Sequence, residues 1–307
     1  MKMVEMISNM LGLVFREQWA LQNFFDGIGD LFRGGGARGI AATFVMIMQM
    51  FNMIATGEAV DAWGPELDLT GYELVFEDEF EGDSLDLDIW KTRSEGKNRD
   101  GFGSLEQVSV SDGALKITGE YREDGPYGEG WYAGAIGLKE WYTRGYFEIR
   151  MICAPSEDFW SAFWLQGNGS YHPETSKGGV GAVEIDVCEA FYGVKGKDDA
   201  YTPAMHLSGL NGSTEDVIYS RNLGSFRGDN IYSEYNTFGM MWTETEYIFY
   251  VNGVETVRTD FGDGICENPE EVIVSLEVPS NGKFDNADKN DKCEMLVDYV
   301  RIYQLAE

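Results

Sequence analysis

The sequence predicts an all-β sandwich, because three observations agree. Past residue 70, short runs of alternating apolar and polar residues are separated by turn signals, which is the pattern of half-buried strands. The 307-residue chain holds 14% aromatic residues and 38 Gly against 7 Pro, a composition typical of a turn-rich β-protein. No segment past residue 70 shows a competing helical period. The length allows one large β-domain with an appendage.

The strands are expected in close succession from residue 72 onward. Asn252-Gly253 separates two of them, and both positions of such a two-residue turn need positive φ, so a hairpin is predicted there. The expected strands cover residues 72–79, 105–110, 113–119, 133–138, 144–152, 159–166, 183–190, 202–208, 236–242, 247–251, 254–257, 271–277 and 294–303.

A separate unit is predicted at residues 1–60, ahead of a domain at 61–307. Residues 40–55 form a mostly apolar run that follows Arg33 and Arg38 and ends in small residues. This is the order of a secretory signal, although the run is short for a membrane span, which needs about 20 apolar residues. An earlier stretch carries apolar residues at helical spacing. The unit is interpreted as an export signal or anchor, as a helical appendage, or as the product of a misassigned start codon.

The formal net charge of −30 falls almost entirely on the predicted domain. Residues 1–60 hold four Lys/Arg and five Asp/Glu, a net −1, which leaves −29 on residues 61–307. So negative a domain repels nucleic acid, and no Lys/Arg cluster interrupts the acidity. We therefore expect no nucleic-acid partner, membrane contact only through residues 1–60, and a monomer.

The four cysteines are too few and too scattered for a disulfide framework, and no Cys-x-x-Cys or His cluster indicates zinc. Cys266 and Cys293 lie in loop-like contexts in which they could pair. Cys188 is interpreted as a small buried residue rather than a nucleophile.

Residues 184–189, Glu-Ile-Asp-Val-Cys-Glu, place three carboxylates in a segment that otherwise has the pattern of a buried strand. On a regular strand Glu184 and Asp186 share a face, whereas Glu189, at an odd offset, points to the other. One extra residue in a β-bulge would return Glu189 to the first face. The two Glu Cα atoms would then lie roughly 13 Å apart. Side chains that lean together could approach the carboxyl separation of about 5 Å found in retaining glycosidases.

In that chemistry one carboxylate attacks the anomeric carbon and the other protonates the leaving oxygen. Asp186, between them, would help to hold a proton on Glu189 and would orient Glu184. The alternative is a solvated strand face of three carboxylates, with Ile185 and Val187 directed toward a core.

Six segments resemble, in order, the pattern of glycoside hydrolase family 16, and the likeness spans residues 72–304. Besides residues 184–189, they are Phe-Glu-Asp-Glu-Phe at 76–80, Ser-Asp-Gly-Ala-Leu-Lys-Ile at 111–117, Gly-Tyr-Phe-Glu-Ile-Arg at 145–150 with Phe-Trp-Ser-Ala-Phe-Trp at 159–164, Tyr-Ile-Phe-Tyr-Val-Asn-Gly at 247–253, and Val-Asp-Tyr-Val-Arg-Ile-Tyr at 297–303.

This resemblance implies a concanavalin-like β-jelly roll of two curved antiparallel sheets. It also implies retaining endo-hydrolysis of a β-linked polysaccharide, in which Glu184 would be the nucleophile, Asp186 the helper and Glu189 the acid/base. No cofactor is required for that chemistry.

A β-1,3- or mixed β-1,3/1,4-glucan is the expected substrate, because the acidic domain argues against sulfated or uronate-rich polysaccharides. Two departures keep the substrate open. Residues 177–183 replace the Trp-Pro or Trp that many β-1,3-glucanases carry, and the extra residue at 187–188 points away from lichenases. The alternatives are an agarase- or carrageenase-type galactan hydrolase, a transglycosylase, and a non-catalytic lectin-like module. The expected location is secreted or cell-surface.

Five residues are predicted to contact the polysaccharide. Trp160 and Trp164 share one strand face, and aromatic rings stack on the C–H faces of sugars, although core packing would also explain them. The resemblance assigns Glu148 and Arg150 to sugar hydrogen bonds, with an internal ion pair as the alternative. It also places His206 in the cleft, on the strand after the catalytic one.

Members of the family commonly hold a structural calcium away from the cleft. The matching positions are the backbone oxygens of Glu79 and Gly113 and the carboxylate of Asp298, and calcium prefers oxygen ligands. A salt bridge would explain Asp298 equally well.

Overall fold

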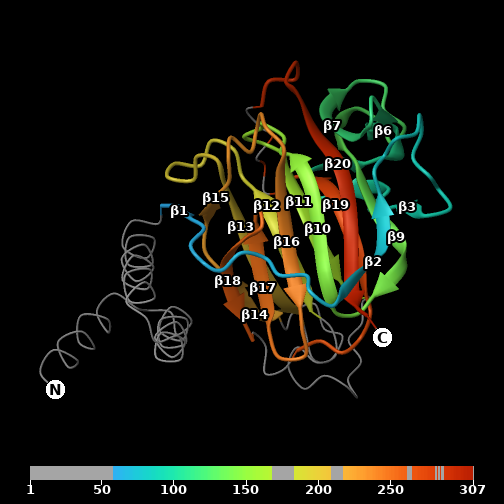
Figure 1. Cartoon of the computed structure of the whole chain (residues 1–307). Coiled ribbons are helices and arrows are strands. Elements are labelled where there is room, and N and C mark those ends of the chain that lie inside the picture. The colour runs from blue at the N-terminus through green and yellow to red at the C-terminus, as the bar shows by residue number, and fades with distance from the viewer. Residues whose placement is uncertain are drawn as a thin grey trace, which may run out of the picture.

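The described part of the chain in the computed structural model covers residues 58–167, 183–208, 217–260, 265–280, 282, 284 and 287–306. These residues form two β-sheets packed as layers (Figure 1). The predicted all-β sandwich is therefore confirmed. The helical unit expected at residues 1–60 lies almost wholly outside the described residues, as do residues 177–182. Among the residues that are described, no helix has the length and apolar character needed to cross a membrane.

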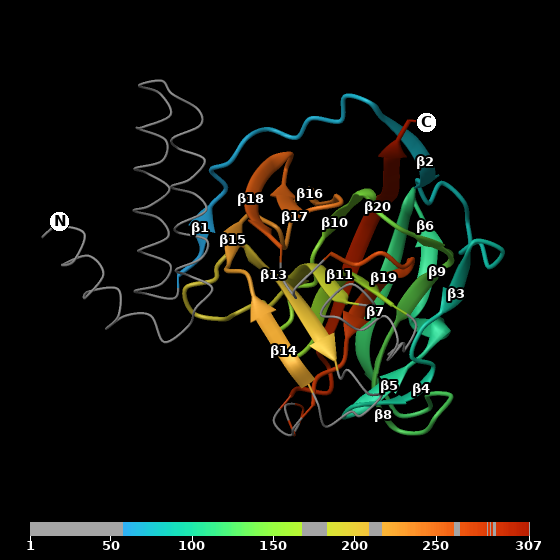
Figure 2. The ribbon, with the colours of Figure 1, turned by 90° about the horizontal axis from the view of Figure 1, so that it is seen from below.

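The first sheet has nine strands and is called the β12 sheet, after the strand that holds residues 184–189. Its strand β14 pairs only with β13 among the described strands and extends alongside it (Figure 2). The order is β1 (Val60–Asp61), β15 (Phe226–Arg227), β13 (Ala200–Ser208), β12 (Glu184–Ala190), β11 (Trp160–Gln166), β19 (Glu270–Glu277), β9 (Ala135–Tyr142) and β3 (Trp90–Thr92), with β14 (Val217–Asn222) beside β13.

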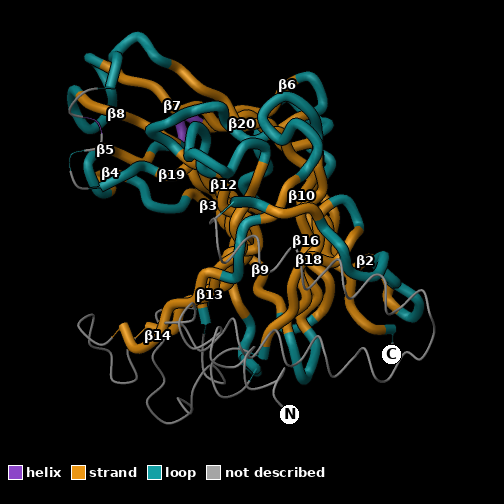
Figure 3. Tube along the Cα trace, turned by 90° about the vertical axis from the view of Figure 1, so that its left-hand side faces the viewer, coloured by secondary structure: helices purple, strands orange, loops and turns teal. Residues whose placement is uncertain are grey.

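The second sheet has eleven strands and is called the β10 sheet. Three of its short strands, β4, β5 and β8, lie together at one end of the molecule (Figure 3). The order is β18 (Val254–Thr259), β17 (Tyr247–Val251), β16 (Asn236–Trp242), β10 (Gly145–Ile152), β20 (Lys292–Leu305), β7 (Ala114–Arg122), β8 (Gly130–Ala133), β5 (Gly101–Gly103) and β4 (Gly96–Asn98), with β2 (Tyr72–Asp78) beside β20 and β6 (Val108–Ser111) beside β7.

The core lies between the two sheets because alternate residues of both sheets face inward. On β10, Phe147, Ile149 and Met151 are fully buried, and on β11 Phe163 and Leu165 are as well. All of them belong to one hydrophobic cluster. The even-numbered residues of β11 therefore lie on the outer face of the β12 sheet.

The predicted Asn252-Gly253 hairpin is confirmed, since it joins β17 to β18 with φ of 49° and 74° at the two turn residues. The expected strands correspond closely to the observed ones, except that residues 105–107 form a short 3₁₀ helix (Leu105–Gln107) ahead of β6. Seven of the described strands were not predicted. Five of them are only two or three residues long, which is too short to show an alternation. The other two are β8 and β14. One of the five short strands, β1, begins at Val60, so the folded domain starts before residue 61.

All four cysteines are free thiols. Cys266 is buried and its Sγ donates to Glu270 at 3.3 Å, whereas Cys293 lies on β20 beside Gly119 of β7. The pairing of Cys266 with Cys293 that the sequence left open is therefore not formed. Cys188 is fully buried in the core, as expected.

The carboxyl of Glu270 supports the start of β12 from inside the protein. It is fully buried, and one oxygen, Oε1, accepts a hydrogen bond of 2.9 Å from the backbone N–H of Val183. The other oxygen, Oε2, has no hydrogen-bond partner among the described residues. Burial raises the pKa of Glu270 to about 8, so this side chain is a neutral acid at pH 7.

We predict that Glu270→Gln changes the pH dependence of stability. Because the folded pKa of Glu270 is raised, its contribution to stability is greatest below the unfolded pKa and is lost as the pH rises toward 8. Glutamine does not titrate. The free energy of unfolding of the variant, relative to that of the wild type, should therefore increase by roughly 1.4 kcal/mol for each pH unit in that window. Urea unfolding at pH 5, 6, 7 and 8 measures this difference. A difference that stays constant with pH would contradict the assignment.

Candidate active site

A β-bulge interrupts β12 at the position that the sequence predicts. Toward β11, Asp186 pairs with Trp164 and Cys188 pairs with Phe163, which leaves Val187 as the extra residue. Toward β13, the register likewise shifts between Asp186 and Glu189. The predicted bulge is confirmed.

The bulge returns Glu189 to the face that carries Glu184 and Asp186. Ile185 and Cys188 belong to the core cluster, so the three carboxylates point to the outer side of the β12 sheet. Asp186 is only 5% exposed, and Glu184 and Glu189 are partly buried. The alternative of a freely solvated strand face therefore does not describe this segment.

Asp186 on β12 is paired with His206 on the neighbouring strand β13. The Nε2 of His206 lies 3.0 Å from Oδ2 of Asp186, and His206 stands directly opposite Glu184 in the register of β12 with β13. Burial raises the pKa of Asp186, and the hydrogen bond from His206 opposes that rise. The same hydrogen bond raises the pKa of His206. His206 thus lies beside the carboxylates, where the resemblance placed it.

Glu189 has the environment of a proton donor. Burial raises its pKa to about 8, and the neighbouring charge of Asp186 adds to the rise. Its Oε1 accepts a hydrogen bond of 2.9 Å from the indole N–H of Trp160. At neutral pH the side chain is therefore largely protonated, which is the state that a general acid requires.

Glu184 has a different set of neighbours. Burial raises its pKa, and the charge of Asp186 adds to this, whereas His206 and a hydrogen bond from the amide of Gln166 act in the opposite direction. Gln166 lies opposite Glu184 in the register and donates to Oε2 through Nε2. Of the two glutamates, Glu184 is therefore the one whose carboxylate accepts a hydrogen bond from a side-chain amide.

Both predicted tryptophans lie on this outer face, next to arginines. Trp160 has Phe191 beside it, with ring centroids 5.7 Å apart, and the guanidinium of Arg99 5.1 Å from its ring centroid. Trp164 donates to Oγ of Ser275 at 3.0 Å, and the guanidinium of Arg93 is 5.5 Å from its ring centroid. Their contact with a polysaccharide stays a prediction.

Five further residues near the carboxylates were missed by the sequence analysis: Arg93, Arg99, Gln166, Phe191 and Lys197. Only Gln166 had a clear signal, since it follows Trp164 by two residues and so shares its face. The others come from segments outside the strand pattern around residues 184–189. Burial lowers the pKa of Lys197, and the charge of Glu189 opposes this, which marks the loop after β12 as part of the site.

The prediction that Glu148 and Arg150 contact the sugar in the cleft is wrong. Both lie on β10, in the other sheet, and Phe147 and Ile149 on the alternate face point into the core. The two therefore face away from residues 184–189. The carboxylate of Glu148 accepts hydrogen bonds of 2.8 Å from each of two tyrosines, Tyr146 and Tyr299.

The anticipated Glu148–Arg150 ion pair does not form either. Arg150 pairs with Asp298 and lies over the ring of Tyr235 at 4.6 Å from its centroid.

The predicted calcium residues lie on the β10 sheet side, away from β12. Glu79 follows β2, Gly113 occupies the β6–β7 turn, and Asp298 is the extra residue of an irregularity in β20. Asp298 is bonded to Arg150, so the salt bridge that was the alternative for this carboxylate is present. Calcium at the backbone oxygens of Glu79 and Gly113 stays a prediction.

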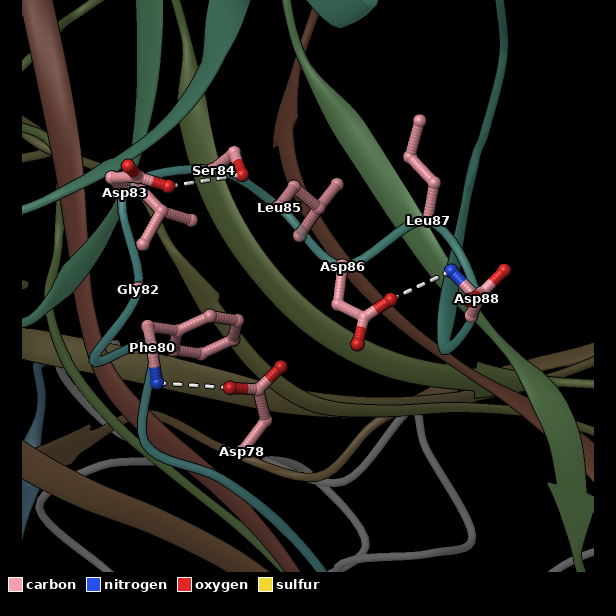
Figure 4. A pocket seen from close by; sticks show the side chains of 10 residues that line it. Asp78, Phe80, Gly82, Asp83, Ser84, Leu85, Asp86, Leu87 and Asp88 are labelled. Atoms are coloured by element: carbon pink, nitrogen blue, oxygen red, sulfur yellow. Dashed lines mark hydrogen bonds between the residues drawn. The ribbon is translucent and has the colours of Figure 1, made fainter.

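A cavity of about 550 Å³ lies elsewhere, in the loop after β2 (Figure 4). Its lining includes none of the predicted substrate contacts. Asp78 accepts from the backbone N–H of Phe80 at 2.9 Å and from the indole of Trp90 at 2.7 Å, and Asp86 accepts from the backbone of Asp88 at 2.8 Å. These acidic side chains serve to shape the loop.

Comparison with known proteins assigns the chain to a family. Residues 74–305 match the family model described as beta-porphyranase A-D, GH16 domain. The chain belongs to glycoside hydrolase family 16. The resemblance inferred from the sequence is thus confirmed.

Curated relatives and solved structures agree with this membership. Endo-1,3-1,4-beta-glycanase ExsH of Rhizobium meliloti (strain 1021) is 27% identical over 209 residues, which are 66% of this chain and 40% of the relative. Glucan endo-1,3-beta-glucosidase A1 of Niallia circulans is 23% identical over 274 residues, or 77% and 38% of the two chains. The chain therefore spans about two fifths of the length of these relatives.

Two solved structures show the shared fold. The non-specific endo-beta-1,3(4)-glucanase SCLam superimposes with a TM-score of 0.64 at 20% identity, covering 82% of this chain and 98% of its own. The kappa-carrageenase zobellia_236 from Zobellia galactanivorans gives 0.63 at 20% identity, covering 76% and 96%. The predicted jelly-roll sandwich is confirmed.

We predict that Asp186→Asn moves both limbs of the pH profile of polysaccharide hydrolysis to lower pH. The charge of Asp186 raises the pKa of both Glu184 and Glu189, so its removal lets both ionise earlier. At pH 7 less Glu189 is protonated, and part of the typical 10²- to 10⁴-fold contribution of general acid catalysis is lost. The measurement is kcat/KM against pH, with the exposed Asp291→Asn as the matched control. Loss of kcat with unmoved limbs would contradict this role.

Proposed function

We propose that the protein is a retaining endo-hydrolase of a β-1,3- or mixed β-1,3/1,4-glucan. Glu184 is the nucleophile, Glu189 the acid/base and Asp186 the helper. The observation that carries this proposal is the bulged strand. It presents two glutamates on one face, one protonated at neutral pH with a pKa of about 8 and the other receiving an amide hydrogen bond. A retaining glycosidase needs this division between an acid and a nucleophile.

The two steps follow from these states. In the first, an oxygen of Glu184 bonds to the anomeric carbon, the glycosidic C–O bond breaks, and the proton of Glu189 passes to the leaving oxygen. In the second, ionised Glu189 takes a proton from water, the water oxygen bonds to the anomeric carbon, and the ester to Glu184 breaks. Two displacements on opposite faces return the original configuration.

A neutral glucan is favoured by the relatives and by the charges around the site. The names of the Rhizobium and Niallia relatives specify 1,3-1,4- and 1,3-β-linkages. The arginines beside Trp164 and Trp160 are each paired with a carboxylate, Arg93 with Glu271 at 3.7 Å and Arg99 with Glu277 at 2.7 Å. Their charges are therefore compensated within the protein, in a domain that is strongly negative.

A galactan, sulfated or not, is the second candidate substrate. The matching family model is named for beta-porphyranases, and a kappa-carrageenase shares the fold. For a polyanion to bind, Arg93 or Arg99 would have to exchange its protein carboxylate for a substrate sulfate. Export to the medium or the cell surface, proposed from residues 1–60, suits either polymer, since both are found outside cells.

A polysaccharide panel tests the substrate. We expect reducing ends and a ladder of oligosaccharides from laminarin or mixed-linkage β-glucan, and none from agarose, porphyran or kappa-carrageenan. Release only from a galactan would contradict the glucan assignment and leave the mechanism intact. Extension of added oligosaccharide acceptors in place of hydrolysis would indicate a transglycosylase.

Azide separates the roles of the two glutamates. In Glu184→Ala, which should abolish hydrolysis, azide takes the place of the carboxylate and yields a glycosyl azide of inverted configuration from an activated aryl oligosaccharide. In Glu189→Ala, slowed by roughly 10²- to 10⁴-fold, azide attacks the covalent intermediate and the product retains its configuration. NMR of the products measures this, and exposed Glu294→Ala on β20 is the control. Exchanged configurations would reverse the two assignments.

A further inference from the structure

One side chain joins the predicted nucleophile to a cation next to β3, an edge strand of the β12 sheet. Gln166 pairs with Glu184 on one neighbouring strand and with Glu271 on the other. Its amide nitrogen donates to Oε2 of Glu184, and its amide oxygen accepts a hydrogen bond of 2.6 Å from Nη2 of Arg93. The amide therefore bridges a carboxylate and a guanidinium.

Arg93 determines which end of this amide meets Glu184. A guanidinium has only donors, so the carbonyl oxygen of Gln166 must be the end that faces Arg93. The NH₂ group is then directed to the carboxylate of Glu184. If the amide were flipped, its NH₂ group would face the guanidinium of Arg93 and its carbonyl oxygen would face the carboxylate of Glu184. Both hydrogen bonds would then be lost.

The position of Arg93 is itself fixed by three neighbours. Its backbone N–H donates to Ala135 at 2.9 Å, its guanidinium lies over Trp164, and its Nε is 3.7 Å from Oε2 of Glu271. Glu271 also pairs with Lys91 at 3.2 Å.

The space for Glu271 comes from a glycine on β9. A Cβ at Gly137 would lie 2.0 Å from Oε1 of Glu271, so a larger residue there would require this carboxylate to move.

We propose that Gln166 is a positioning residue of the hydrolase, oriented by Arg93, that keeps Glu184 ionised and aimed at the anomeric carbon. The inference rests on the proposed role of Glu184 as nucleophile. A hydrogen bond to the charged form stabilises that form, which is why Gln166 lowers the pKa of Glu184 against the effect of burial. Oε2 is held by the amide, and Oε1 is the oxygen that attacks.

The first test is Gln166→Leu, with Gln166→Glu as a second variant that keeps the shape but has no NH₂ donor. We expect kcat to fall roughly 10-fold to 100-fold, the range for one hydrogen bond to a charged group. The acid limb of kcat/KM should move to higher pH in both variants, while the basic limb, which reports Glu189, stays near its wild-type position. Gln304→Leu, on β20 of the other sheet, is the matched control.

A double-mutant cycle with Arg93→Met tests the orienting role. If Arg93 acts by fixing the amide, then Gln166→Leu with Arg93→Met should be no slower than Gln166→Leu alone. If the activity lost in the double variant equals the product of the losses in the two single variants, the orienting role of Arg93 is overturned. An unmoved acid limb in the folded Gln166 variants, judged by near-UV circular dichroism, would overturn the role of Gln166.

These failures are distinct from a failure of the proposed function. Wild-type activity together with azide products of the expected configuration from Glu184→Ala establishes the nucleophile independently of Gln166. The acid limb of kcat/KM in the Gln166 variants and the double-mutant cycle with Arg93→Met then test the positioning role by themselves.

Discussion

The extra residue in β12 is the constraint on which the site depends. Without it, a strand that alternates at every position would bury Glu189 in the core and expose Cys188. With Val187 unpaired toward β11, Cys188 enters the core and Glu189 joins Glu184 and Asp186 on the outer face. The register on both sides of β12 shifts at this point, so β11 and β13 each accommodate the same bulge. The chemistry of the strand therefore follows from one backbone irregularity.

Three carboxylates so close together need distinct partners if they are to differ in charge. Asp186 has His206, Glu189 has the indole of Trp160, and Glu184 has the amide of Gln166. The strongest donor, a histidine that can carry a charge, is bonded to the most deeply buried carboxylate of the three. Since burial raises the pKa of all three, these donors distinguish the proposed proton donor, Glu189, from the proposed anion, Glu184.

The sequence was sufficient for features that depend on local pattern. Long strands show their alternation, Asn252-Gly253 specifies its turn, and the odd offset of Glu189 requires a bulge. It was insufficient where the answer depends on which sheet a strand joins. Glu148 and Arg150 do share a face, as alternation predicts, but that face lies on the opposite side of the sandwich, where tyrosines and Asp298 bond them. Arg93 and Lys197 reach the site from loops whose path only the tertiary structure defines.

The central claim, that Glu184 forms the covalent bond, can be measured directly. A 2-deoxy-2-fluoro oligosaccharide of the cleaved polymer, with an activated leaving group, should accumulate as a glycosyl-enzyme because the fluorine slows both displacements. Mass spectrometry of the digested protein should then find one added glycosyl unit, carried by Glu184. A label on Glu189 or Glu277, or a product of inverted configuration with no label, would contradict the account.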